Sequence, residues 1–258
     1  MSESPIQHRQ FFGEGLPYLP SGPWRGLLIV IEGTDGVGRT TQVNLLREWL
    51  EVQGYGVIET GWTRSKLIGN ALTEAKKGHT LTRITHTLMY ATDFADRQEY
   101  QILPALRNGF IVLADRYVYT AFARAVVRGV HPDYVRDLFG FAVVPDLMFY
   151  LRLSVPALIR RTLACDRMNY WESGMDLNLG ADLYDSFKRY QSLIIRQFDK
   201  MAEDFGFITV DAHRKPDRIQ DVLREHVGSL LETRELAPTT GLDADMAPDQ
   251  PASAQTGT

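Results

Sequence analysis

The segment at residues 27–46, LLIVIEGTDGVGRTTQVNLL, joins an apolar run to a helical pattern through a glycine-rich turn. The unalternated, β-branched residues at 27–31 predict a strand buried on both faces, as in a parallel sheet. Residues 33–40 fit the phosphate-binding P-loop pattern G-x-x-x-x-G-K-[ST], except that Arg39 stands where lysine is expected. The segment therefore predicts a strand–loop–helix unit that binds a nucleotide phosphate; a glycine-rich turn that binds nothing is the alternative.

Each part of the loop has an expected role. Glycines let the backbone approach a ligand, and the N–H groups at the following helix start form a nest for an anion. Thr40 would offer its hydroxyl to a phosphate-bound Mg²⁺, and Arg39 would bridge the outer phosphates of ATP. Arginine is longer than lysine, planar and bidentate, so the exchange is not conservative. The predicted ATP-binding residues are Gly33, Thr34, Asp35, Gly36, Val37, Gly38, Arg39, Thr40 and Thr41.

Strand and helix patterns alternate along most of the chain. Strands are predicted at 27–31, 57–60, 110–115, 147–153 and 207–211. Helices are predicted at 38–53, 66–77, 82–108 with a bend or early end at Pro104, 119–128, 132–141, 155–165, 181–205 and 216–231. This order predicts a three-layer α/β/α domain of the P-loop NTPase type, with a parallel five-stranded sheet whose ligands bind at the carboxyl ends of its strands.

Composition and charge limit the domain bounds and the classes of protein to which the chain can belong. The predicted domain spans 25–232, after an N-terminal extension at 1–24 that lies over the surface or is partly mobile, and before a disordered tail at 233–258. The net charge of -4 gives no global basic field for a nucleic-acid polymer. No apolar run approaches the roughly 20 residues of a membrane span. The single cysteine, Cys165, allows no intrachain disulfide, so we expect a cytoplasmic protein.

Two further clusters carry charge suited to phosphoryl transfer. Asp115 and Arg116 follow the buried run FIVL; the aspartate would reach the metal's water shell and the arginine would hold a second phosphate. The alternative is an Asp–Arg ion pair that closes the strand end. Arg160, Arg161 and Arg167 follow the next strand and could close over the transferring group, or could form a solvated basic helix face.

The motifs EGTDGVGRTTQ, VLADRY, PDLMFYLRLSVPALIRR and DLYDSFKRYQ, in this order, resemble the thymidylate kinase family of nucleoside monophosphate kinases over about residues 26–231. The resemblance implies a cytoplasmic homodimer that uses ATP and Mg²⁺ to convert dTMP to dTDP. It implies that Asp35 faces the acceptor sugar and that Asp115, Arg116 and Tyr117 form the family's DRY segment. Gly36 fills the family's slot for a P-loop arginine, which implies that the catalytic arginine comes from Arg160, Arg161 or Arg167.

Departures from the family fall mostly on the acceptor side. Gly61 stands at the arginine position of the family's T-R-E-P-G-G-T segment, with Arg64 close by, and Arg124 stands where an aromatic residue lies after DRY. The family's base-reading arginine falls near Asp93 or Phe94, with Arg97 about one turn further on. We therefore expect Arg64, Arg97, Tyr119 and Arg124 to rebuild the acceptor pocket. A kinase for another small phosphorylated acceptor and a non-catalytic nucleotide-binding protein stay as alternatives.

Overall fold

The sheet is the centre of the molecule. A computed structural model describes residues 11–18, 24–78, 81–164, 168–234, 236 and 238. Its strands form one parallel five-stranded sheet in the order β2-β3-β1-β4-β5. Their bounds are β1 (Leu27–Gly33), β2 (Val57–Gly61), β3 (Ile111–Asp115), β4 (Leu147–Arg152) and β5 (Ile208–Asp211). The predicted fold class and the parallel five-stranded sheet are confirmed.

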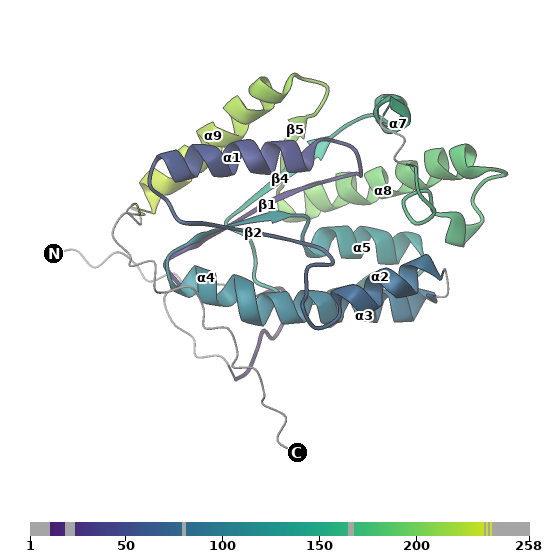
Figure 1. The fold of residues 1–258 in the computed structure, drawn as a ribbon, viewed down its shortest axis with the longest axis horizontal. Helices are drawn as coiled ribbons and strands as arrows, with labels where there is room; N and C mark the ends of the chain where they lie inside the picture. The colour runs from purple at the N-terminus through teal and green to yellow at the C-terminus, as the bar shows by residue number, and fades with distance from the viewer. Residues whose placement is uncertain are drawn as a thin grey trace, which may run out of the picture.

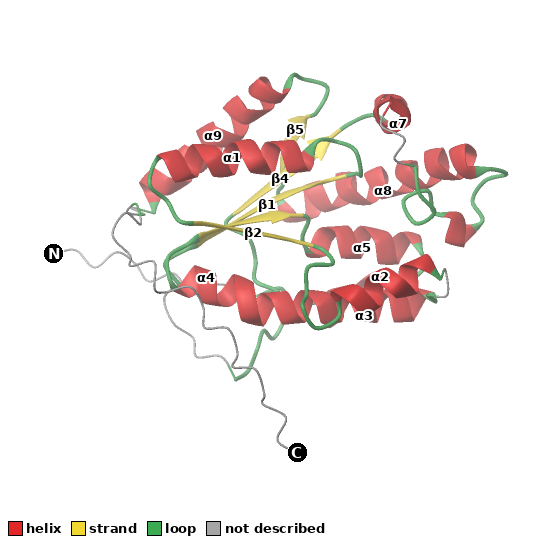
Figure 2. Cartoon of the chain, viewed as in Figure 1, coloured by secondary structure: helices red, strands yellow, loops and turns green. Residues whose placement is uncertain are grey.

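Helices cover both faces of this sheet (Figure 1). One face carries α1 (Arg39–Val52) and α9 (Pro216–Thr233); the other carries α3 (Arg83–Arg97), α4 (Leu103–Arg107), α5 (Val118–Val127) and α8 (Leu183–Phe205). The shorter helices are α2 (Gly69–Lys77) and α7 (Val155–Ala164), both labelled in Figure 2, and α6 (Pro132–Leu138). No helix in the described part of the chain is both long and apolar enough to cross a membrane.

The central strand β1 is buried along its whole length. Its side chains alternate between two hydrophobic cores, with Leu28 and Val30 in one and Leu27, Ile29 and Ile31 in the other. In register, Ile31 lies beside Asp115 of β3 and Gly33 beside Leu151 of β4. The carboxyl ends of β1, β3 and β4 therefore meet at one edge of the sheet, where the P-loop leaves β1.

The helix predicted over 82–108 is divided into three pieces. A π-helix, η1 (Gln98–Ile102), separates α3 from α4. Pro104 has no N–H to continue the helical ladder, and the wider turn precedes it. Within η1, Gln101 accepts a hydrogen bond from Thr60 Oγ1 at 2.9 Å and donates one to the Glu59 carbonyl at 3.0 Å, so the irregular turn is tied to β2. Other predicted ends shift by a few residues: the helix expected at 66–77 begins at Gly69, and that at 132–141 ends at Leu138.

Part of the predicted N-terminal extension packs on the domain. Phe12 N donates to the Ala142 carbonyl at 3.0 Å, and the Phe12 ring meets the edge of Tyr119 at 5.5 Å. Phe122 and Phe205 pack around the same ring. Residues 11–18 thus lie over the domain surface, while residues 1–10, 19–23 and most of the predicted tail at 233–258 lie outside the described residues.

Candidate active site

The P-loop presents backbone donors at the start of α1. Gly38 is the N-cap of α1 with φ 105°, and no side chain caps this helix start. Gly36 has φ 79°, and a Cβ there would come within 3.2 Å of Thr162 Oγ1. Both glycines are exposed, as are Thr40 and Thr41. The free N–H groups of the first turn of α1 therefore lie at the surface, where they can receive phosphate oxygens.

Arg39 folds back beneath the loop instead of extending along it. The side chain is 7% exposed, and its Nε donates to Asp115 Oδ1 at 2.8 Å. Nη1 bonds the carbonyl oxygens of Gly33 and Thr34. The guanidinium reaches the carbonyls through Nη1 and the carboxylate through Nε, two nitrogens held in one plane, whereas a lysine would have to reach all three groups from one ammonium. In this structure the arginine is thus part of the loop's internal bonding, and it does not occupy the outer position expected from the sequence.

Asp115 joins the P-loop to β3. Thr40 Oγ1 donates to Asp115 Oδ2 at 2.7 Å, on the side of the carboxylate away from Arg39. Hydroxyl and carboxylate oxygens are hard ligands, and Mg²⁺ usually takes one or two of them together with phosphates and water. The described residues include no group of three or more His, Cys, Asp or Glu side chains that could form a closed metal site. The Thr40–Asp115 pair therefore fits an Mg²⁺ ion that arrives on a nucleotide.

A second charge cluster lies beside the loop. Arg116 has φ 75° and pairs with Asp35, while Arg124 Nη2 lies 2.8 Å from the other oxygen of Asp35. All three side chains are largely buried, and burial lowers the pKa of Arg116 to about 9, with the charge of Arg124 acting in the same direction. Both arginines stay charged at neutral pH, so this cluster carries one net positive charge. Arg116 thus pairs with Asp35 and Asp115 with Arg39, and the alternative Asp115–Arg116 pair is not formed.

Glu32, which is not among the predicted site residues, supports this cluster from within β1. The fully buried carboxylate accepts hydrogen bonds from Tyr117 N at 2.7 Å, Thr120 N at 3.0 Å and Thr120 Oγ1 at 2.6 Å. It thereby caps the N-terminus of α5 and fixes the turn that carries Arg116. Burial raises the pKa of Glu32, although these hydrogen bonds oppose the shift. The signal available in the sequence was one glutamate inside an otherwise apolar strand.

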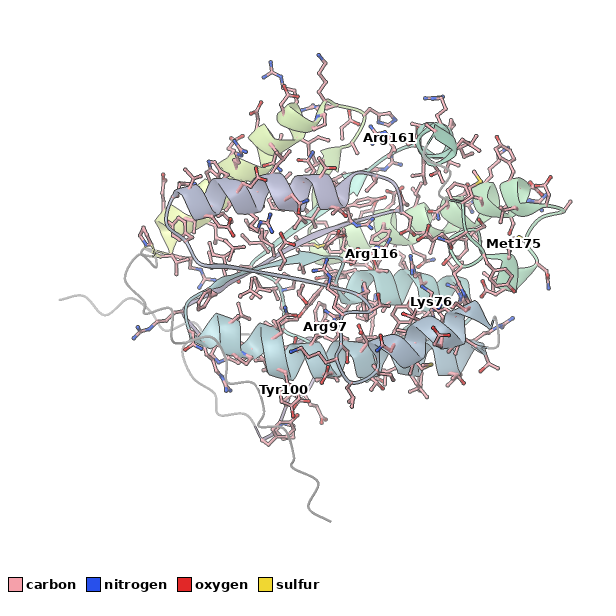
Figure 3. All side chains as sticks on the ribbon, in the orientation of Figure 1. Lys76, Arg97, Tyr100, Arg116, Arg161 and Met175 are labelled. Carbon is pink, nitrogen blue, oxygen red and sulfur yellow. The ribbon has the colours of Figure 1, made fainter. Side chains whose placement is uncertain are left out.

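The predicted lid arginines differ in their surroundings. Arg161, labelled beside α7 in Figure 3, donates to the Val37 carbonyl of the P-loop at 2.9 Å and to the Ala212 carbonyl at 2.8 Å. It therefore ties the loop to the end of β5, and its helix face is not simply solvated. Arg160 is exposed, and none of the described carboxylates forms an ion pair with it. Arg167 lies outside the described residues.

Several predicted acceptor residues are not brought to this edge. Arg97 is 3% exposed, stacks over Trp62 at 5.2 Å and donates to Asp93. Tyr117 is buried and donates its hydroxyl to the Val143 carbonyl at 2.9 Å. Tyr119 packs in the core against Phe207 at 4.6 Å. Arg64, by contrast, is exposed beside Gly61, which pairs in register with Asp115, so Arg64 does lie at this edge, next to the end of β2. Of the predicted acceptor residues, the structure gathers Asp35, Arg116 and Arg124.

Comparisons with known proteins agree with this geometry. The family model described as thymidylate kinase matches residues 31–222. The chain is 42% identical over 210 residues to a probable thymidylate kinase 2 of Saccharolobus solfataricus, covering 81% of this chain and 98% of the relative. It is 32% identical over 212 residues to a probable thymidylate kinase of Thermococcus gammatolerans (79% and 95%), and 37% identical over 195 residues to a thymidylate kinase of Clavibacter sepedonicus (72% and 87%). The chain belongs to the thymidylate kinase family.

Proposed function

We propose that the chain transfers the γ-phosphoryl group of ATP to dTMP, giving dTDP and ADP. The observation that carries the proposal is the Asp35–Arg116–Arg124 cluster, which lies beside the P-loop and has one more cation than it has carboxylates. A triphosphate on the loop and a monophosphate on the arginine pair would face each other at one edge of the sheet. Phosphoryl transfer requires mainly this positioning and the neutralisation of charge.

The acceptor phosphate would exchange places with the Asp35 carboxylate on Arg116 and Arg124. Both guanidiniums can bond a phosphate in the way they now bond Asp35. Freed from the arginines, Asp35 turns to a hydroxyl of the acceptor sugar. The acceptor phosphate needs no general base if it arrives as a dianion, and Glu32 keeps Arg116 in place through its bonds to the start of α5.

The donor side uses the backbone of the loop. The N–H groups from Gly36 to Thr41 hold the donor phosphates, and Arg39 keeps the loop in shape through Gly33, Thr34 and Asp115. Thr40 and Asp115 would hold Mg²⁺, which supplies positive charge next to the β- and γ-phosphates. Of the two described lid arginines, Arg160 is our candidate for the group that closes over the transferring phosphoryl, because Arg161 already bonds two backbone carbonyls.

We also propose that the enzyme is a homodimer that associates through α3. Ile84 and Leu88 lie one turn apart on this helix and are 45% and 42% exposed. Apolar side chains at such spacing suit a helix–helix contact between copies. Light scattering on the Leu88→Glu variant tests this: the variant should be monomeric, and a dimer of unchanged stability would contradict the proposed interface. A cytoplasmic location stays a prediction.

Coupled ADP release over a panel of nucleoside monophosphates tests the reaction. We expect the highest kcat/KM with dTMP. The best turnover with another acceptor would favour the alternative kinase, and ATP binding without turnover on any acceptor would leave a non-catalytic nucleotide-binding protein. Arg124→Gln should raise KM for dTMP by about 10- to 100-fold with KM for ATP unchanged, since a hydrogen bond to a charged group contributes about 1.5–3 kcal/mol. Arg136→Gln, at an exposed arginine of α6, is the matched control.

A further inference from the structure

Three side chains that no step of the proposed kinase reaction uses lie together past the ends of β4 and β5. The two strands pair in parallel, with Arg152 beside Asp211 in register. Ser154 and His213 each follow this pair by two residues, so the register brings them to the same level beyond the carboxyl ends of the strands. Ser154 directly precedes α7, which follows the end of β4 in Figure 1. The fold therefore gathers a serine, a histidine and an aspartate in one small cluster.

Hydrogen bonds connect the serine to the aspartate through the histidine. Ser154 Oγ lies 3.0 Å from His213 Nε2, and His213 Nδ1 lies 2.7 Å from Asp211 Oδ1. The same carboxylate oxygen accepts a hydrogen bond from the His213 backbone N–H at 3.0 Å, which fixes the histidine relative to the aspartate. The two ring nitrogens thus face different partners, one a hydroxyl and the other a carboxylate.

The aspartate determines which ring nitrogen carries the proton. Donation from the backbone N–H and the imidazole of His213 lowers the pKa of Asp211 below its ordinary value, so the carboxylate is ionised at neutral pH and can only accept. The Nδ1 that faces it therefore carries the hydrogen, and in the neutral imidazole Nε2 is left as an acceptor. Ser154 consequently donates its Oγ–H to Nε2, which is the direction in which the imidazole can remove that proton.

The cluster has the three parts of a serine hydrolase site. A nucleophilic hydroxyl, a general base and a carboxylate that orients the base recur within hydrogen-bond reach on unrelated folds. The first N–H groups of α7, next to Ser154, have no carbonyl partner within the helix, and such donors stabilise negative charge on an oxygen. His213 and Asp211 are 47% and 52% exposed, so a small substrate can approach from the solvent, and the electrostatic gain is smaller than in a closed site.

We propose that Ser154, His213 and Asp211 form a second reactive site, which hydrolyses small carboxylic esters. Ser154 Oγ forms a bond to the ester carbonyl carbon while His213 Nε2 takes its proton; the bond from that carbon to the alcohol oxygen then breaks, and the alkoxide receives the proton from Nε2. Water attacks the acyl-serine, passes a proton to Nε2 and displaces the serine oxygen, which takes that proton back. The products are one carboxylic acid and one alcohol, and the site returns to its starting state.

The test uses the full chain without nucleotide. A fluorophosphonate probe reacts with serines that a base activates, and peptide mass spectrometry identifies the labelled residue. We expect the label on Ser154, and it should form about 100-fold more slowly in His213→Gln, since a positioned general base contributes about 10²–10⁴-fold. Hydrolysis of p-nitrophenyl acetate should fall in this variant and in Ser154→Ala. The matched control is His131→Gln, at an exposed histidine 3.6 Å from Asp133, which should react as fast as the wild type.

Two results would overturn the inference. One is a wild-type protein in which the probe leaves Ser154 unlabelled, a result that needs no variant and so does not depend on how a variant folds. The other is a His213→Gln protein that is labelled and hydrolyses the ester as fast as the wild type. Because neither assay contains ATP or a nucleoside monophosphate, these outcomes are independent of whether the chain phosphorylates dTMP.

Discussion

The buried, neutral His86 should make the protein sensitive to acid. Its ordinary pKa of 6.5 falls to about 2 in the folded protein, because the side chain is buried and faces the cations Arg128, Arg124 and Lys76. Below pH 6.5 the unfolded chain binds a proton at this position and the folded protein does not. Stability therefore rises with pH through this range, and it is lost as the pH falls below 6.5.

The size of the effect follows from the linkage relation. Each pH unit well below 6.5 costs the folded state about 1.4 kcal/mol, until the folded group itself begins to titrate near pH 2. Between pH 7 and pH 5 the folded state loses about 2 kcal/mol of stability, because the half unit from pH 7 to the unfolded pKa of 6.5 contributes little. For a domain with a total stability of about 5–15 kcal/mol, this is a large share.

The assay is urea unfolding of the wild type and of His86→Phe at a series of pH values from about 5 to 8. Other groups titrate in both proteins, so the quantity that matters is the difference between their free energies of unfolding. This difference should shift by about 2 kcal/mol in favour of the variant from pH 7 to pH 5. His86→Gln, which is polar but does not titrate, should shift by the same amount. Parallel pH curves for the wild type and both variants would refute the reasoning.

Four substitutions test other contacts. Arg39→Lys should lower kcat about a hundredfold or more, equivalent to about 2.7 kcal/mol, because one ammonium replaces two nitrogens fixed in a plane, of which Nη1 bonds two carbonyls and Nε bonds Asp115; retained kcat would mean that the guanidinium merely replaces the usual lysine. Asp115→Asn should lose most of its kcat with an unchanged circular dichroism spectrum, and a normal kcat would contradict its metal role. Phe12→Ala should lower the free energy of unfolding by about 2 kcal/mol, since the ring is half-buried; an unchanged urea midpoint would mean that residues 11–18 contribute no stability. Glu32→Gln should gain stability relative to the wild type as the pH rises above about 5, because the raised pKa of Glu32 makes its ionised form costly to bury; a constant difference would show that its hydrogen bonds fully offset burial.

Much of the fold could be predicted because the sequence patterns that specify its strands and loops involve residues close together in the chain. An unalternated apolar run predicts a doubly covered strand, and glycines mark the P-loop where Gly36 and Gly38 take positive φ. The π-helix η1 could not be predicted in the same way. Pro104 shows that the ladder must break, but the bonds from Gln101 to β2 that stabilise the wider turn are formed between distant parts of the chain.

The acceptor residues were harder to predict, because a position in a motif does not give the direction of a side chain. Thr120, Arg124 and Arg128 follow one another at four-residue spacing, so they share one face of α5. Tyr119 lies on a different face and enters the core. Applied to the sequence, this spacing would have separated Arg124 from Tyr119. Helical spacing would not have identified Glu32, because this residue lies on β1 and its hydrogen-bond donors lie at the start of α5.

In both groups of charged residues at the site, the arginines are bonded to an aspartate. Arg39 is bonded to Asp115, and Arg116 and Arg124 are bonded to Asp35, so each guanidinium is paired with a carboxylate. These pairings allow several arginines to lie close together without strong mutual repulsion. If the acceptor phosphate binds to Arg116 and Arg124 as proposed, it gains its contacts by displacing Asp35, and its affinity is then a difference between two sets of charge-assisted bonds. On that proposal, a substitution that removes the Asp35 carboxylate would strengthen the binding of a bare phosphate, while it removes the group proposed to face the acceptor sugar.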